Sequence, residues 1–306
     1  MALWEKKKKE HRVSNAVVFL LAFILFLVVF GGLCLWMVVK INEERRGAES
    51  SANGFSEVSN GNTFGPEDAR NLLIVTVDAD QAQGFLAVRS DPANTRMTAL
   101  AFPRDTVLDY GTSEYKAYEL YAEQGIGRTK DALETLSGIR FDNYAVITYA
   151  NIEKVIDHFE EGLIFTLTES LDYHEGDLNI RLDGGLRTLS SSQVVGMLRY
   201  PAWHGGRKQQ ADIQAQVVAA LVNQFLRENR ADKADADFSA LVNLVKSDIM
   251  VSHYNAAKSG LAYLASRNDG TLCVTLSLEG EYEGSGDALR FYAADGVAES
   301  LSRTFG

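Results

Sequence analysis

The chain has 306 residues, 46% of them hydrophobic, which is enough for a sizeable core in one large or two ordinary domains. Its formal net charge is −11 at pH 7, with +4 on residues 1–46 and −15 on the remainder, and so acidic a body argues against a nucleic-acid partner. Two cysteines and five scattered histidines exclude a disulfide framework and the usual structural zinc spacing.

The amino-terminal region carries a basic tail and a long apolar run. Residues 1–15 are predicted to be a cytoplasmic tail, and the run from Ala16 to Val39 contains no charge. This run exceeds the roughly 20 residues that a bilayer-spanning helix needs. Five basic residues precede it and three follow, which predicts an extracellular main domain. A cleaved signal peptide is the alternative, but the run is longer than a typical signal core, so we expect an uncleaved single-pass anchor in the cell membrane.

The remainder divides into a linker and one domain. Residues 40–67 are predicted to be a flexible linker, since residues 47–66 are rich in Gly, Ser, Asn and Glu. From residue 68 to 306, candidate strands and helices are interspersed. This alternation predicts a mixed α/β domain with a central β-sheet covered by helices on both faces.

Hydrophobic patterns place the expected elements. Strands are expected at 72–77, 85–88, 97–102, 144–149, 163–167, 178–182 and 271–278. Helices are expected at 130–137, 152–159, 191–199, from soon after 206 to 225, near 238–246, at 256–265 and at 296–303. Thr129 is the expected amino cap of the first helix, and residues 91–94 should form a hairpin turn.

One expected strand is followed closely by two charged residues. Residues 97–102 are apolar on both faces, as in a central strand, and Pro103 should end the pairing because it has no N–H to donate. Arg104 and Asp105 then emerge at the carboxyl end, where open α/β sheets usually bind ligands. Spacing alone favours the simpler interpretation that the two form ion pairs in a loop.

Several motifs, taken in order, resemble those of the LytR-CpsA-Psr family. They occupy residues 71–78, 101–106, 116–118, 138–144, 185–189 and 198–200. The resemblance runs from about residue 71 to 225, and more loosely to the end, behind the short cytoplasmic tail and single membrane helix that this family has. The chain is therefore identified as a divergent member of the family, and this identification outweighs the loop interpretation.

The resemblance implies a phosphotransferase that moves a glycopolymer from a polyprenyl-pyrophosphate carrier to peptidoglycan with the help of Mg²⁺. By resemblance, Arg104, Lys116 and Arg199 bind the pyrophosphate, and Asp105 ligates the metal. Arg207 could add a phosphate contact at the start of a helix. Arg104, Asp105 and Arg199 are the expected catalytic residues. Guanidinium groups suit phosphate oxygens, and Mg²⁺ prefers oxygen ligands. The expected partners are this lipid-linked glycopolymer, peptidoglycan and, through residues 16–39, the membrane.

Two departures from the family pattern leave the activity open. Gln83 lies in the segment where the family usually has a metal-binding aspartate, and an amide offers no charge to a cation, although Asp78 or Asp80 could compensate. Pro201 replaces a further arginine of the family. The alternative is a non-catalytic member that binds polyprenyl-phosphate lipid or an envelope partner as a scaffold or regulator. We favour the enzyme because Arg104, Asp105, Lys116 and Arg199 are all retained.

Overall fold

The computed structural model describes residues 64–306, except for the side chains of residues 231 and 232. The predicted tail, membrane helix and most of the predicted linker lie outside the described residues. Within residues 64–306, no helix is both long enough and apolar enough to cross a membrane.

A six-stranded sheet with the order β11-β6-β1-β2-β3-β12 forms the centre of the domain. The strands are β11 (Lys246–Ser247), β6 (Asn143–Thr148), β1 (Arg70–Asp78), β2 (Gln81–Asp91), β3 (Arg96–Phe102) and β12 (Cys273–Ser277). β1 is parallel to β6, β3 is parallel to β12, and β2 is antiparallel to both β1 and β3. Four strands therefore run in one direction, and their carboxyl ends meet at one edge of the sheet.

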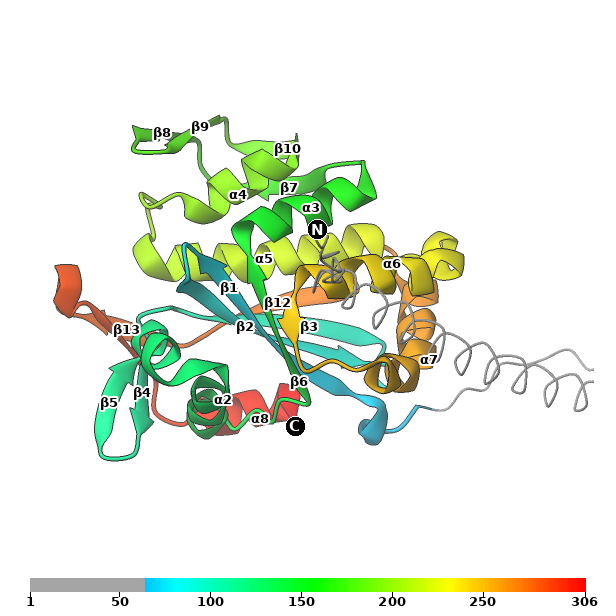
Figure 1. The fold of residues 1–306 in the computed structure, drawn as a ribbon, viewed down its shortest axis with the longest axis horizontal. Helices are drawn as coiled ribbons and strands as arrows, with labels where there is room; N and C mark the ends of the chain where they lie inside the picture. Colours follow the sequence, from blue (N-terminus) through cyan, green and yellow to red (C-terminus); the bar gives the residue numbers. More distant parts are fainter. Residues whose placement is uncertain (1–63) are drawn as a thin grey trace, which may run out of the picture. The chain divides into compact units, whose positions relative to one another are not determined.

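Helices pack on both faces of this sheet (Figure 1). They are α2 (Ala117–Ser137), α3 (Tyr149–Phe159), α4 (Ser191–Arg199), α5 (Gly206–Phe225), α6 (Ala234–Leu241), α7 (Val251–Arg267) and α8 (Val297–Phe305). Successive residues of β2 point to opposite faces of the sheet. Phe85 belongs to the core formed with α2 and α8, whereas Leu86 belongs to the core formed with α5. The expected mixed α/β fold with a central sheet is confirmed.

Four two-stranded sheets and four 3₁₀ segments surround this centre. The paired strands are β4 (Val107–Tyr110) with β5 (Ser113–Lys116), β7 (Leu163–Leu167) with β10 (Gly185–Leu189), β8 (Leu171–Glu175) with β9 (Leu178–Leu182), and β13 (Gly280–Glu283) with β14 (Arg290–Ala293). The 3₁₀ segments are η1 (Pro66–Asp68), η2 (Glu228–Lys233), η3 (Val242–Leu244) and η4 (Gly286–Ala288). The sequence predicted β7 and β9 but not the other six short strands.

The expected amino cap at Thr129 is wrong. α2 begins at Ala117, so Thr129 lies inside the helix, where its hydroxyl donates to the Gly125 carbonyl at 3.0 Å. Gly125 has a φ of 75° and interrupts the helix, which explains why the apolar periodicity becomes recognisable only after this position. The expected hairpin at 91–94 is confirmed by the antiparallel pairing of Asp91 with Arg96.

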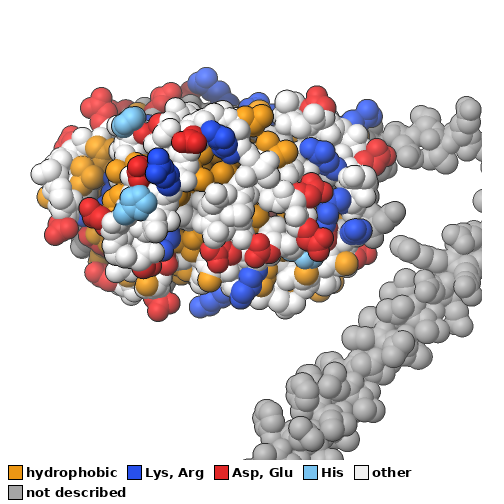
Figure 2. Space-filling view, turned by 90° about the horizontal axis from the view of Figure 1, so that it is seen from above, with side chains coloured by type: hydrophobic (Ala, Val, Ile, Leu, Met, Phe, Trp, Pro, Cys, Tyr) orange, Lys and Arg blue, Asp and Glu red, His pale blue; other side chains and the backbone are white. Residues whose placement is uncertain are grey.

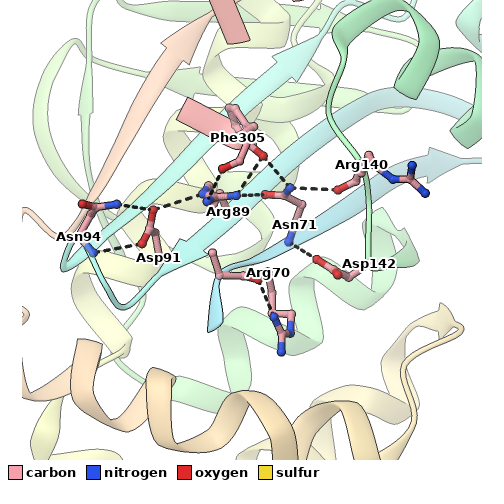
Figure 3. A network of polar contacts seen from close by, with 10 residues as sticks. Arg70, Asn71, Arg89, Asp91, Asn94, Arg140, Asp142 and Phe305 are labelled. Carbon is pink, nitrogen blue, oxygen red and sulfur yellow. Dashed lines mark hydrogen bonds and ion pairs between the residues drawn. The ribbon is translucent and has the colours of Figure 1, made fainter. Parts of the chain in front are cut away.

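A buried polar network ties the last helix to the sheet (Figure 3). Arg89 donates to the carbonyl oxygens of Phe305 at 3.0 Å and Gly306 at 2.9 Å, and Asn71 donates to the same Phe305 oxygen at 3.0 Å. Asp91 accepts a hydrogen bond from Arg89 at 3.4 Å. These bonds offset the cost of burying Arg89, Asn71 and Asp91. Asn71, which opens one of the family-like motifs, therefore serves the fold.

Candidate functional site

The turn after β3 brings Arg104 and Asp105 to the edge where the four strands end. β3 ends at Phe102, as the proline predicted. The backbone N–H and the hydroxyl of Thr106 both donate to the Pro103 carbonyl, at 3.0 and 2.6 Å. Thr106 is completely buried, so these two hydrogen bonds hold the turn within the interior of the domain.

Arg104 is partly buried, and only some of its guanidinium N–H groups have hydrogen-bond partners. Its Nη1 donates to Oε1 of Gln83 at 2.6 Å, and its guanidinium carbon lies 4.3 Å from the ring centroid of Tyr118. Its Nε is buried and has no hydrogen-bond partner. Burial lowers the pKa of Arg104, which Asp105 partly counteracts. The side chain therefore presents an unpaired donor at the strand end.

Asp105 is the most deeply buried acid of the site. Its side chain is 8% exposed, and its Oδ2 has no hydrogen-bond partner. The nearest cation to this oxygen is Arg207 at the start of α5, whose Nε lies 3.9 Å away. Burial raises the pKa of Asp105, although Arg207, Arg104 and Lys116 all act to lower it. The carboxylate is thus an acceptor held among three cations.

Lys116 reaches the site from the end of β5. Its side chain is 4% exposed, and Nζ lies 3.6 Å from Oε1 of Glu119. Nζ also donates to the backbone carbonyl of Asp287 in η4. Nζ of Lys116 and the guanidinium carbon of Arg104 lie 5.6 and 4.3 Å from the ring centroid of the same residue, Tyr118, so the structure brings these two expected site residues together.

The hairpin β13–β14 closes one side of the site. The N–H of Phe291 donates to the backbone carbonyl of Asp105 at 3.0 Å, and Phe291 pairs across the hairpin with Tyr282. The centroids of the Tyr282 and Phe291 rings are 5.1 Å apart. The hydroxyl of Tyr282 is buried without a partner, and burial together with the charge of Asp105 raises its pKa. No motif in the sequence pointed to Tyr282, which is one tyrosine among twelve.

α5 positions Gln83 from the other side. Gln214 accepts a hydrogen bond from the Thr76 hydroxyl at 3.1 Å and donates to the Gln83 carbonyl at 3.2 Å. A β-carbon at Gly84 would lie 1.8 Å from the Gln214 amide oxygen, so a larger residue there would displace this amide from Thr76 and Gln83. The start of β2 is therefore locked against α5.

Arg199 lies at a separate part of the same edge. Its Nε is 3.2 Å from Oδ2 of Asp78 at the end of β1, and its Nη2 is 2.7 Å from Asp177. The hydrogen bond that Arg199 donates to Asp177 is the main cause that raises the pKa of Arg199. Burial and the charge of Asp78 raise the pKa of Tyr149, and the charges of Arg104 and Arg199 act to lower it. Arg199 is thus committed to two carboxylates.

The donor set around Asp105 does not fit a magnesium ion. Within residues 64–306, no three His, Cys, Asp or Glu side chains form a group that could hold a metal. Asp105 supplies one carboxylate, Oε1 of Gln83 is taken by Arg104, and the main charges acting on Asp105 are those of Arg207, Arg104 and Lys116. Mg²⁺ requires a near-octahedral set of oxygen ligands.

The two acids considered as replacements for the missing aspartate are placed elsewhere. Asp78 pairs with Arg199. Asp80 is exposed in the β1–β2 turn, where it and Ala79 have positive φ values of 65° and 45°.

Fold and site together define a mixed α/β domain with a cationic site at its strand ends. The sequence model of the LytR_cpsA_psr family matches residues 38–300, and the chain belongs to this family.

Individual relatives are distant. The chain is 24% identical over 224 residues to the regulatory protein MsrR of Staphylococcus aureus, a match that covers 69% of this chain and 66% of that protein. Among solved structures, Bacillus subtilis TagV superposes with a TM-score of 0.65 at 20% identity, covering 78% of this chain and 95% of TagV. TagT bound to LI-WTA superposes with a TM-score of 0.60 at 16% identity, covering 83% and 96%. These structures share the fold.

Charged side chains are mixed on the face drawn in Figure 2. Lysine and arginine alternate there with aspartate and glutamate, and hydrophobic side chains lie between them. The expected lack of a nucleic-acid partner stays a prediction.

Proposed function

We propose that this protein transfers a glycopolymer from a polyprenyl-diphosphate carrier to peptidoglycan. Membership of the LytR-CpsA-Psr family supports cell-wall glycopolymer attachment at the level of the family, and the fold shared with TagV and with TagT bound to LI-WTA is consistent with it. The glycopolymer and the acceptor sugar of this chain are not specified by these similarities.

One observation carries the proposal, namely the convergence of cations and unpaired polar atoms on Asp105. Arg104, Lys116 and Arg207 act together on its carboxylate. Nε of Arg104 and the hydroxyl of Tyr282 are buried donors without partners. Such donors cost free energy unless a ligand accepts from them, and a diphosphate offers several anionic oxygens.

In this transfer, Asp105 and the three cations around it have different roles. A peptidoglycan hydroxyl oxygen forms a bond to the phosphorus that carries the glycopolymer, and the bond from that phosphorus to the bridging oxygen breaks. Polyprenyl phosphate leaves with the electron pair, and the hydroxyl proton passes to the unpaired Oδ2 of Asp105. Arg104, Lys116 and Arg207 hold the diphosphate and stabilise the charge that develops on its oxygens.

An apolar cavity at the far end of α5 suits the lipid tail. α5 has 20 residues, which corresponds to a length of about 30 Å. Arg207 lies at its start, and a cavity of about 320 Å³ lies at its end, lined in part by Phe159, Leu221 and Phe225. A polyprenyl ligand would place its diphosphate at one end of the helix and its apolar chain toward the other.

The expected membrane anchor at residues 16–39 belongs to this proposal. It would hold the domain at the outer surface of the membrane, where a polyprenyl-linked substrate resides. This arrangement is supported by the uncharged run in the sequence and by the family.

The proposal is tested by turnover. The full chain is incubated with a polyprenyl-diphosphate-linked oligosaccharide and peptidoglycan fragments, and mass spectrometry is used to detect polyprenyl phosphate and the phosphodiester product. We expect both with the wild-type chain and neither with Asp105→Ala. The Asp105→Ala variant must unfold at a temperature close to that of the wild type.

A non-catalytic role as a lipid-binding scaffold or regulator is the second candidate. The pairing of Arg199 with both Asp78 and Asp177 favours it, because an arginine already neutralised by two carboxylates has less to offer a phosphate. Lipid binding without either reaction product in the same assay would select this candidate.

A further inference from the structure

The missing second carboxylate coincides with an arginine beside the remaining one. Gln83 stands where the family pattern has a metal-binding aspartate, and its Oε1 accepts from Arg104 at 2.6 Å. Nε of Arg207 lies 3.9 Å from Oδ2 of Asp105. The remaining carboxylate therefore has a guanidinium group beside it, while a neutral amide bonded to Arg104 stands at the position of the second acid.

The charge around Asp105 is already positive without an added ion. Arg104, Lys116 and Arg207 act on Asp105 with three positive charges, and Glu119 acts against them. Asp212, which acts on the neighbouring Tyr282, is paired with Lys208 at 3.4 Å. Glu119 is held by Lys116, because it accepts a hydrogen bond from the Lys116 backbone N–H at 3.0 Å and lies 3.6 Å from Nζ. A divalent cation placed here would be repelled by three cations and attracted by few free oxygens.

A diphosphate needs cations and donors, and both are present. The buried Nε of Arg104 and the buried hydroxyl of Tyr282 have no partners. The first turn of α5, which carries Arg207, adds the positive end of a helix. These groups can neutralise an anionic ligand in the way that a bound metal does in other phosphate sites.

We infer that this site binds the diphosphate of its substrate without a divalent cation, with Arg207 beside Asp105 supplying the charge that Mg²⁺ would otherwise supply. The inference rests on the proposed function, since it concerns the same diphosphate. It assigns Asp105 to accepting a proton instead of ligating a metal.

The test is a binding titration of the full chain in detergent micelles with geranylgeranyl diphosphate, in the presence of EDTA and in the presence of MgCl₂. We expect the two dissociation constants to agree within about threefold, a difference below about 1 kcal/mol. Geranylgeraniol, which lacks the diphosphate, should bind much more weakly in both buffers.

Two arginine variants make the test specific. Arg207→Gln should weaken binding in EDTA by about tenfold to a hundredfold, because it removes a charge-assisted contact. Arg128→Gln is the matched control, since Arg128 is exposed and also pairs with an acid, Asp131, at 3.9 Å. It should leave binding unchanged.

The outcomes separate this inference from the proposed function. Binding that requires MgCl₂ would overturn the inference and leave the proposed function standing. No binding in either buffer would overturn both. Equal weakening by Arg207→Gln and Arg128→Gln would show that general charge, not Arg207 at this site, holds the ligand, and would also overturn the inference.

Discussion

Oε1 of Gln83 accepts a hydrogen bond from Nη1 of Arg104 at 2.6 Å. The amide thus orients the arginine without neutralising it. A carboxylate in the same place would form an ion pair with Arg104 and compete with the diphosphate for its charge.

Gln83→Glu should therefore make binding depend on metal. The substitution keeps the shape of the side chain and adds a carboxylate in contact with Arg104, which precedes Asp105 in the chain. We expect geranylgeranyl diphosphate binding in EDTA to weaken by about tenfold and to be restored by MgCl₂. Gln81→Glu adds the same charge at an exposed position of the same strand and should change little. Equal effects of the two variants would contradict a specific role for position 83.

Asp105→Asn should stabilise the domain at neutral pH. Because burial raises the pKa of Asp105 in the folded state, its ionised form destabilises the fold at a pH above that raised value. The melting temperature of Asp105→Asn should exceed that of the wild type at pH 7. This excess should disappear as the pH falls through the raised pKa toward 3.8, where the unfolded carboxyl also becomes protonated. A variant that melts below the wild type at pH 7 would contradict this account.

Tyr282→Phe separates a ligand contact from a structural role. The hydroxyl is buried without a partner, so its removal should leave the free energy of unfolding unchanged or raise it by up to about 1 kcal/mol. Diphosphate binding should weaken by about tenfold, because one donor to an anionic oxygen is lost. Urea unfolding and the EDTA titration measure the two quantities. Unchanged binding would remove Tyr282 from the site.

Arg89→Met should destabilise the fold without a direct effect on the site. Arg89 is buried and ties Phe305, Gly306 and Asp91 together (Figure 3). Its loss leaves Asp91 without its buried cation and should cost about 3 kcal/mol in urea unfolding. Arg96→Met, at an exposed position of β3, should cost less than about 0.5 kcal/mol. Similar losses for both variants would contradict the importance of the network.

Much of the fold follows from local pattern. The strands at 72–77 and 97–102 are apolar runs interrupted by Thr76 and Thr98, as expected in a sheet covered on both faces, and Pro103 marks the end of pairing. The first turns of α2 escaped prediction because Gly125 breaks the helix and leaves a short stretch before it, in which Ala117 and Leu120 are the buried side chains. The hairpin β13–β14 escaped because its four-residue strands mix polar and apolar side chains, and tertiary contacts with residues 105 and 106 hold it in place.

The candidate site was predictable only in part. Arg104, Asp105 and Lys116 belong to recognisable motifs, and the structure brings them together with Arg207, whose register was ambiguous in the sequence. No sequence pattern indicated that Asp177 would engage Arg199, because the two residues are 22 positions apart and Asp177 lies in the turn between β8 and β9. Tyr282 reaches the site through a long-range contact, for which a single sequence carries no periodic signal.

The most direct measurement of the central claim is a crystal structure of this protein with geranylgeranyl diphosphate, grown in EDTA. We expect the diphosphate oxygens within hydrogen-bond distance of Arg104 Nε and of Arg207, with no metal peak beside Asp105. A diphosphate bound away from the strand ends, with Arg104 and Tyr282 still unpaired, would contradict the account.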